Sequence, residues 1–183
     1  YEYEIEAELL YDFRRQGAQS VAYSSIVAAG ANACVLHYVE NDAQLQSGDL
    51  LLIDAGCELG GYAADITRTF PVNGKFTTVQ RDIYELVLAA QAAAIEQVKP
   101  GNHWDVPHQA ALRVLCQGFV DLGLCNGSID SIIETENYKR FYMHRTGHWL
   151  GLDVHDAGEY KQAGQWRELL PGMTLTVEPG CYI

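Results

Sequence analysis

The sequence contains no apolar stretch close to the ~18 residues that a membrane-spanning helix requires. It is also poor in basic residues, with 12 lysines and arginines against 24 aspartates and glutamates and a formal net charge of −12. We therefore expect neither a membrane nor a nucleic acid as a partner, because a nucleic-acid surface needs basic patches. The acidic excess either serves solubility alone or indicates that some carboxylates converge on a cation.

No C-x-x-C pair is present, and the five cysteines are an odd number, Cys34, Cys57, Cys116, Cys125 and Cys181. This pattern predicts a reducing compartment in which cysteines pack as small apolar residues, and hence a cytoplasmic location. We expect no signal peptide before the first helical pattern. Since the chain opens on Tyr1, we expect it to be a piece of a longer protein.

Helical and strand patterns alternate along the 183 residues without a low-complexity linker, which predicts one domain of the α+β class. Thr77 and Gln80 form a capping-box pattern at the start of the clearest helix. The expected helices are 2–17, 77–98 and 105–122, and the expected strands are short strands within 24–38, a β-hairpin over 48–70 and a strand over 173–180. His103 and His108 flank a helix start, where we expect them to cap the helix or face solvent.

The 48–70 hairpin carries two aspartates near its turn. If "ELGG" (58–61) is the loop, Cys57 faces Tyr62, and the same register places Asp54 directly opposite Asp65. Opposed residues have Cβ atoms roughly 4.5–5.5 Å apart, where like charges are destabilising. Two such carboxylates share a proton or bind a cation, and a dication is the simpler solution at neutral pH. The alternative is that Asp54 is only a turn residue near Gly56.

Two further side chains extend this hypothesis. His148 offers a nitrogen ligand, and Glu178 ends an apolar strand before Pro179, as Asp54 ends its own strand. Taken alone, each also fits a hydrogen-bonded or solvated structural role. Two aspartates, a histidine and a glutamate form a hard donor set suited to Mn²⁺, Co²⁺ or Zn²⁺. Several carboxylates together suggest two metal ions that share an activated water.

The histidine-rich segment "HRTGHWLGLDVHD" (144–156) does not carry the zincin motif. Arg145 follows His144 where that motif has a glutamate, and Gly147 is a poor helix former. From Trp149 onward the pattern predicts an extended chain. His148 is therefore the candidate ligand, and His144 and His155 have other roles.

Three motifs in this order resemble the Xaa-Pro aminopeptidase (aminopeptidase P) family, namely "IDAGCELGGYAADITRTFPVNGKF", "HRTGHWLGLDVHD" and "LTVEPGCYI". This family is a branch of the pita-bread superfamily, with prolidase, methionine aminopeptidase and creatinase. The resemblance covers nearly the whole chain. It implies a pita-bread fold and hydrolysis of the Xaa-Pro bond at the N-terminus of peptides that have proline second.

The resemblance also implies residue roles. Asp65 would bridge two divalent metals, Mn²⁺ above Co²⁺ or Zn²⁺, with Asp54 on one metal and His148 and Glu178 on the other. Glu178 would double as the general base. The remaining candidates would act on the substrate. His144 would stabilise the tetrahedral intermediate, and His155 would hydrogen-bond the substrate or the transition state. His37 would line the proline pocket, and Tyr182 would contact the substrate.

The same resemblance predicts that residues 1–183 are a metallopeptidase catalytic domain that is incomplete at its C-terminus. The family's fifth ligand, a glutamate, has no counterpart before Ile183, and the N-terminal domain of the family has none either. We expect a homo-oligomer for the whole protein. The alternative functions are a prolidase acting on Xaa-Pro dipeptides and, for this piece, an inactive metal-poor binding module.

Overall fold

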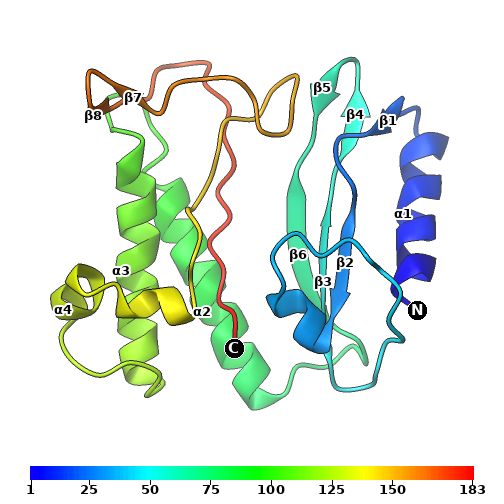
Figure 1. The fold of residues 1–183 in the computed structure, drawn as a ribbon, viewed down its shortest axis with the longest axis horizontal. Helices are drawn as coiled ribbons and strands as arrows, with labels where there is room; N and C mark the ends of the chain where they lie inside the picture. Colours follow the sequence, from blue (N-terminus) through cyan, green and yellow to red (C-terminus); the bar gives the residue numbers. More distant parts are fainter. The chain divides into compact units, whose positions relative to one another are not determined.

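A three-stranded antiparallel sheet lies at the centre of the N-terminal part of the chain. The computed structural model describes residues 1–183, and the chain divides into two units. The first unit comprises residues 1–80 and 150–156, and the second comprises residues 81–149 and 157–183. Both helices and antiparallel strands are present, which confirms the α+β class (Figure 1). That the two units form one domain stays a prediction.

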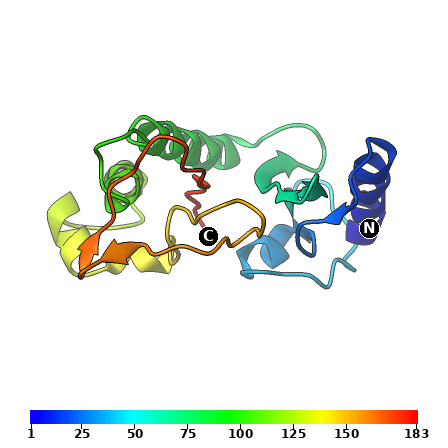
Figure 2. The same cartoon turned by 90° about the horizontal axis from the view of Figure 1, so that it is seen from above.

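The first unit contains two three-stranded sheets, with the strand orders β2-β3-β6 and β1-β4-β5. Its elements are α1 (Glu2–Arg15), β1 (Ser20–Val21), β2 (Ile26–Ala29), η1 (Gly30–Cys34), β3 (Leu50–Ala55), β4 (Cys57–Leu59), β5 (Tyr62–Ala63) and β6 (Ile66–Pro71). Helix α1 lies beside β2 in both views (Figures 1 and 2), where Ile5 and Leu9 pack against Val27 and Leu51. The predicted helix 2–17 is confirmed, ending before Gly17.

A buried carboxylate ties the start of α1 to the chain around it. Glu2 is fully buried and accepts hydrogen bonds from the backbone N–H groups of Ala29 and Ala43 and from the side chains of Tyr38 and Asn32. Burial by itself would raise the pKa of Glu2, but these hydrogen bonds outweigh it and the pKa lies below its usual value. The Glu2 carboxylate thus anchors the segment that leads through η1 to Tyr38.

The hairpin over 48–70 is confirmed, but its predicted register is wrong. Asp54 pairs with Thr67 rather than with Asp65, and Leu59 rather than Cys57 faces Tyr62. A shift of two residues keeps every side chain on its own face of the sheet. The two aspartates are therefore diagonal neighbours instead of direct partners.

The turn explains this register. Gly60 and Gly61 have φ values of 63° and 83°, so both central residues of a two-residue turn are left-handed. Glycine adopts this conformation without a Cβ clash, and such turns match the twist of the strands that they connect. The "ELGG" segment therefore closes as a two-residue turn rather than as the expected four-residue loop.

The second unit is built on two long helices. Its elements are most of α2 (Thr78–Ile95), then α3 (Asp105–Asp121), α4 (Ile129–Glu134), η2 (Asn137–Arg140), β7 (Lys161–Gln162) and β8 (Gln165–Trp166). The core of this unit includes Leu112, Leu115 and Phe119 of α3. Gly118 allows α2 and α3 to approach closely, since a Cβ there would lie 2.3 Å from a side-chain carbon of Leu86.

Both predicted helices of this region are confirmed. Thr77 and Gln80 exchange the two hydrogen bonds of a capping box, at 2.9 and 3.3 Å. The prediction of a strand over 173–180 is wrong, because only the bridge between Trp149 and Leu175 is formed there. Residues 175–178 instead run along residues 146–149 as an extended segment that is hydrogen-bonded without forming a ladder.

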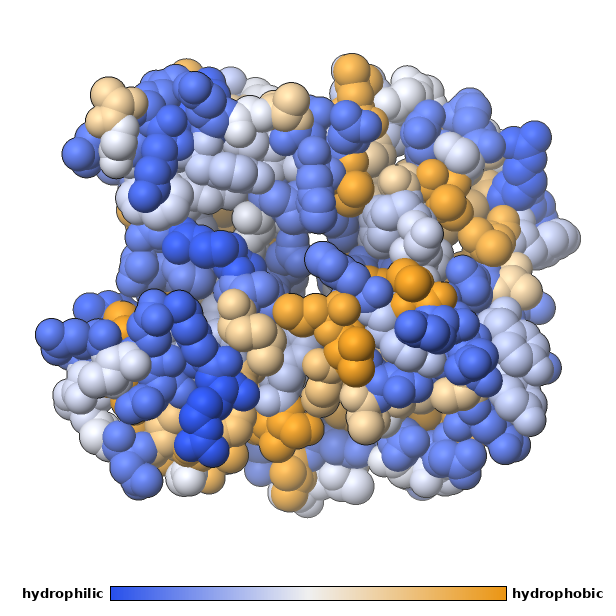
Figure 3. Space-filling view, in the orientation of Figure 1, coloured by the Kyte–Doolittle hydropathy of each residue, from blue (hydrophilic) through white to orange (hydrophobic).

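The face of the molecule in Figure 3 is mainly hydrophilic, with apolar residues in separate patches. This surface agrees with the net charge of −12. No helix in the structure combines the length and apolar character that a membrane crossing needs.

Candidate functional site

The first unit brings Asp54 and Asp65 together through a tyrosine. The Tyr23 hydroxyl donates to Asp54 Oδ1 at 2.5 Å and lies 3.3 Å from Asp65 Oδ1. Burial and the two carboxylates raise the pKa of Tyr23 far above its usual value, so the hydroxyl stays protonated as a donor. Two like-charged groups thus share one neutral donor on one face of the hairpin.

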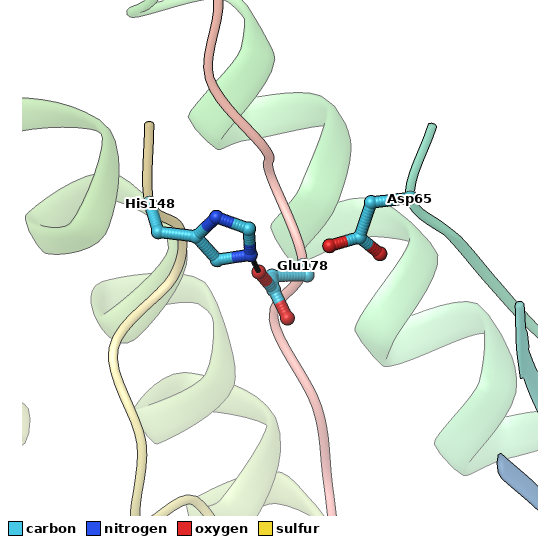
Figure 4. A group of neighbouring side chains, drawn as sticks. All are labelled: Asp65, His148 and Glu178. Atoms are coloured by element: carbon cyan, nitrogen blue, oxygen red, sulfur yellow. Dashed lines mark ion pairs between the residues drawn. The ribbon is translucent and has the colours of Figure 1, made fainter. Parts of the chain in front are cut away.

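The second unit brings His148 and Glu178 together. His148 Nε2 lies 3.1 Å from Glu178 Oε1 (Figure 4). His148 Nδ1 lies 2.9 Å from the carbonyl oxygen of Trp149, so Nδ1 carries the proton of the neutral ring. The lone pair of His148 Nε2 then points toward the Glu178 carboxylate oxygen. Two acceptors at this distance require a proton or a metal ion between them, which fits a metal ligand pair.

Backbone hydrogen bonds set the position of this pair. The Thr176 N–H donates to the His148 carbonyl at 3.0 Å, and the Glu178 N–H donates to the Thr146 carbonyl at 2.7 Å. Gly147 makes this approach possible, because a Cβ there would lie 2.1 Å from the Thr176 carbonyl oxygen. The small residue that argues against a zincin helix is thus a requirement of the observed packing.

His144 and Tyr182, both predicted to meet substrate, lie against each other in the second unit. His144 Nε2 is 2.8 Å from the Tyr182 hydroxyl, and His144 Nδ1 is 2.7 Å from the Arg145 carbonyl oxygen. The carbonyl can only accept, so the proton of the neutral ring lies on Nδ1 and Nε2 accepts from Tyr182. In this arrangement His144 donates from Nε2 only in its protonated form.

The other two histidines of interest belong to the first unit and are exposed. His37 follows η1 with a left-handed φ of 56°. His155 ends a segment that begins at Trp149, and the prediction of an extended chain there is wrong. Residues 151–155 form bends, and the Gly151 N–H donates to the Asp153 carbonyl at 3.1 Å. The Ala63 N–H donates to the Gly151 carbonyl at 2.9 Å and so attaches this segment to the hairpin.

Sequence reasoning missed His108. This side chain is 6% exposed, and its Nδ1 lies 2.8 Å from the Thr146 hydroxyl, which in turn lies 2.6 Å from the Tyr142 hydroxyl. Burial, with the Arg145 guanidinium nearby, lowers the pKa of His108 to about 4. The expectation that His108 caps the helix or faces solvent is therefore wrong, whereas His103 is exposed as expected.

A sequence signal for His108 did exist. The side chain lies at the i position of the apolar series that continues with Ala111, Leu112 and Leu115, which are all buried in α3. Tyr23 and Thr176 were missed as well, since neither lies in a helical series. Their roles depend on contacts between segments that are far apart in the sequence.

The chain is similar to proteins of known family over its whole length. The model of Metallopeptidase family M24 matches residues 1–183. The chain is 58% identical to the Xaa-Pro aminopeptidase of Haemophilus influenzae and 49% identical to that of Escherichia coli, and it covers 42% and 41% of those proteins. The chain therefore spans about two fifths of the length of these relatives.

Solved structures agree with this result. The structure of Pseudomonas aeruginosa aminopeptidase PepP matches all of this chain with a TM-score of 0.99 and 61% identity, and 41% of that structure is covered. A His350Ala form of Escherichia coli aminopeptidase P matches with a TM-score of 0.96 and 48% identity. The expected pita-bread fold is thereby confirmed, and the chain belongs to Metallopeptidase family M24.

Proposed function

We propose that the protein is a dinuclear metal-dependent aminopeptidase that hydrolyses the Xaa-Pro bond at the N-terminus of peptides. The observation that carries this proposal is the pair of potential ligand atoms, His148 Nε2 and Glu178 Oε1, which face each other at 3.1 Å and need a proton or a metal ion between them. The relatives at 58% and 49% identity, both named Xaa-Pro aminopeptidase, support the substrate class. A peptide with proline second is the proposed partner.

We assign Asp54, Asp65, His148 and Glu178 as the metal ligands. Asp65, His148 and Glu178 each offer one ligand atom suited to a divalent ion (Figure 4). Asp54 joins them because it shares the Tyr23 hydroxyl with Asp65. Three carboxylates and one imidazole suit Mn²⁺ first and Co²⁺ or Zn²⁺ next. One solved relative is a zinc-substituted Escherichia coli aminopeptidase P in complex with product.

When bound, two divalent ions supply Lewis acidity toward the scissile carbonyl and acidify the attacking water. Glu178 accepts the proton of that water and returns it to the leaving nitrogen, which carries no N–H of its own in a bond to proline. His155, or His144 in its protonated form, donates to the developing oxyanion. His37 lines the proline pocket and Tyr182 contacts the substrate.

A cytoplasmic location and a homo-oligomeric state complete the proposal. The thiols of Cys116 and Cys125 are free and buried, which supports a reducing compartment. Cell fractionation tests the location, and light scattering on the intact protein tests the oligomer. The expected results are a cytoplasmic fraction and a mass that is a multiple of the monomer mass.

The direct test is an assay of the intact protein on three matched substrates in the presence of Mn²⁺. We expect cleavage of an Xaa-Pro-Xaa peptide, loss of cleavage when the same peptide is N-acetylated, and loss again when a chelator removes the metal. Cleavage of the acetylated peptide would contradict an aminopeptidase. A strong preference for the Xaa-Pro dipeptide would instead indicate a prolidase.

A further inference from the structure

Thr176 contacts both members of the second unit's candidate ligand pair. Its hydroxyl donates to Glu178 Oε1 at 2.7 Å and accepts from the backbone N–H of His148 at 3.0 Å. The residue is 9% exposed, so water competes little for these bonds. One hydroxyl therefore links the backbone of one candidate ligand to the carboxylate of the other.

The single hydrogen of this hydroxyl has a defined acceptor. A threonine hydroxyl has one hydrogen to donate, and Glu178 Oε1 receives it. The bonds run in one direction, from the His148 N–H through the Thr176 O–H to the Glu178 carboxylate, and each bond polarises the next. A hydrogen-bonded carboxylate also loses rotational freedom, and it keeps its second oxygen for another partner.

Backbone packing prevents Thr176 from moving away. The Thr176 N–H bonds to the His148 carbonyl at 3.0 Å, so the residue holds both polar groups of the His148 backbone. Its carbonyl lies against Gly147, where an added Cβ would come within 2.1 Å. Its β-branched side chain has few rotamers, which favours a fixed hydroxyl position.

We infer that Thr176 is a positioning residue that holds His148 and Glu178 in one geometry for metal binding and proton transfer. This inference rests on the proposed function, and it deepens that function by adding a residue outside the metal ligands and the substrate contacts. Hydrogen-bond partners of metal ligands typically contribute roughly 10–100-fold to affinity or activity. We expect a loss of that size when the hydroxyl is removed.

The test compares four variants of the intact protein, Thr176→Val, Thr176→Ser, Thr176→Ala and the control Thr174→Val. Thr176→Val keeps the shape but removes the hydroxyl, and Thr176→Ser restores the hydroxyl without the methyl group. Thr174 is exposed and lies two residues earlier in the chain, so Thr174→Val is a matched control. The readouts are Mn²⁺ affinity by calorimetry, kcat and KM on an Xaa-Pro-Xaa peptide, and thermal unfolding.

We expect Thr176→Val to lose roughly 10–100-fold in Mn²⁺ affinity and in kcat with little change in KM, and Thr176→Ser to recover most of it. Thr174→Val should match the unaltered protein. Unchanged affinity and kcat in Thr176→Val would overturn the inference. If Thr176→Val does not fold, the comparison of Thr176→Ser with Thr176→Ala, which differ by the hydroxyl alone, replaces it, and equal values in that pair would overturn the inference.

The same data separate this inference from the proposed function. An active protein in which Thr176→Val is also fully active would overturn the inference alone. A protein that binds Mn²⁺ without cutting the peptide would overturn the proposed reaction, while the Mn²⁺ affinities would still decide the role of Thr176. A protein that binds no Mn²⁺ would overturn both.

Discussion

The first unit holds two aspartates on a β-hairpin, whereas the second unit holds an imidazole and a carboxylate on irregular chain. Asp54 and Asp65 are kept together by the neutral Tyr23 hydroxyl. His148 and Glu178 contact each other directly at 3.1 Å. The first pair therefore depends on a shared donor and on strand register, and the second depends on backbone packing. Each pair should respond to a different kind of substitution.

The largest expected effect is on catalysis and belongs to the second unit. Glu178→Gln keeps the shape of the side chain but removes the base that accepts the proton of the attacking water. We expect kcat of the intact protein on an Xaa-Pro-Xaa peptide to fall by about 10²–10⁴-fold. The control is Glu134→Gln, at an exposed end of α4. A Glu178→Gln variant within tenfold of the unaltered rate would remove Glu178 from the mechanism.

The next effect is on stability in acid, and it also belongs to the second unit. His108 has a pKa of about 4 in the folded protein against 6.5 ordinarily, so below pH 6.5 the unfolded chain binds a proton that the folded chain does not. The free energy of unfolding should fall as the pH drops from 6.5 to 4, by at most about 3 kcal/mol from this residue.

Substitution identifies the source of this acid sensitivity. His108→Leu should flatten the dependence in that window, as measured by urea unfolding at several pH values. His103→Leu, at an exposed histidine just before the helix, is the control. Equal slopes for His108→Leu and the unaltered protein would show that other groups carry the acid sensitivity.

The first unit should respond to loss of its shared donor. Tyr23→Phe leaves Asp54 and Asp65 close together without the hydroxyl between them, so the metal-free protein should lose about 1–3 kcal/mol of unfolding free energy. Added Mn²⁺ should recover part of this loss, because it neutralises the pair. Tyr62→Phe, at an exposed position of the same hairpin, is the control. Identical metal-free stabilities for the two variants would deny Tyr23 this role.

The smallest effect concerns the turn that sets the register. Gly61→Ala places a Cβ at a φ of 83°, which costs about 1–2 kcal/mol. Gly60→Asn should be nearly neutral, because asparagine accepts the left-handed conformation at φ 63°. Thermal unfolding of both variants checks this difference. A Gly61→Ala variant as stable as Gly60→Asn would mean that the turn is not under this constraint.

Regular elements were predictable because their signals are local. The helix that begins after Thr77 follows from its capping box, and the hairpin follows from apolar strands around a Gly-Gly turn. The register failed because the turn was taken as four residues instead of two. The predicted direct pairing of Asp54 with Asp65 was therefore wrong, although a shift of two residues keeps both side chains on one face, where they are diagonal neighbours.

The contacts of the second unit were not predictable in the same way. The Thr146 hydroxyl meets His108 of α3 and, on its other side, the Tyr142 hydroxyl, and no local pattern encodes these contacts. Thr176 reaches His148 across 28 residues of sequence. His148 and Glu178 were candidate ligands from the sequence, but no sequence pattern shows what holds them in place.

The central proposal is that Asp54, Asp65, His148 and Glu178 all serve as metal ligands. Mn²⁺ titration calorimetry on the intact protein, beside its Asp65→Ala variant, tests this claim most directly. We predict about two ions bound by the unaltered protein, as in two-metal hydrolases, and loss of both in Asp65→Ala. Unchanged stoichiometry and affinity in Asp65→Ala would contradict the claim, because the His148–Glu178 pair would then bind metal without the first unit.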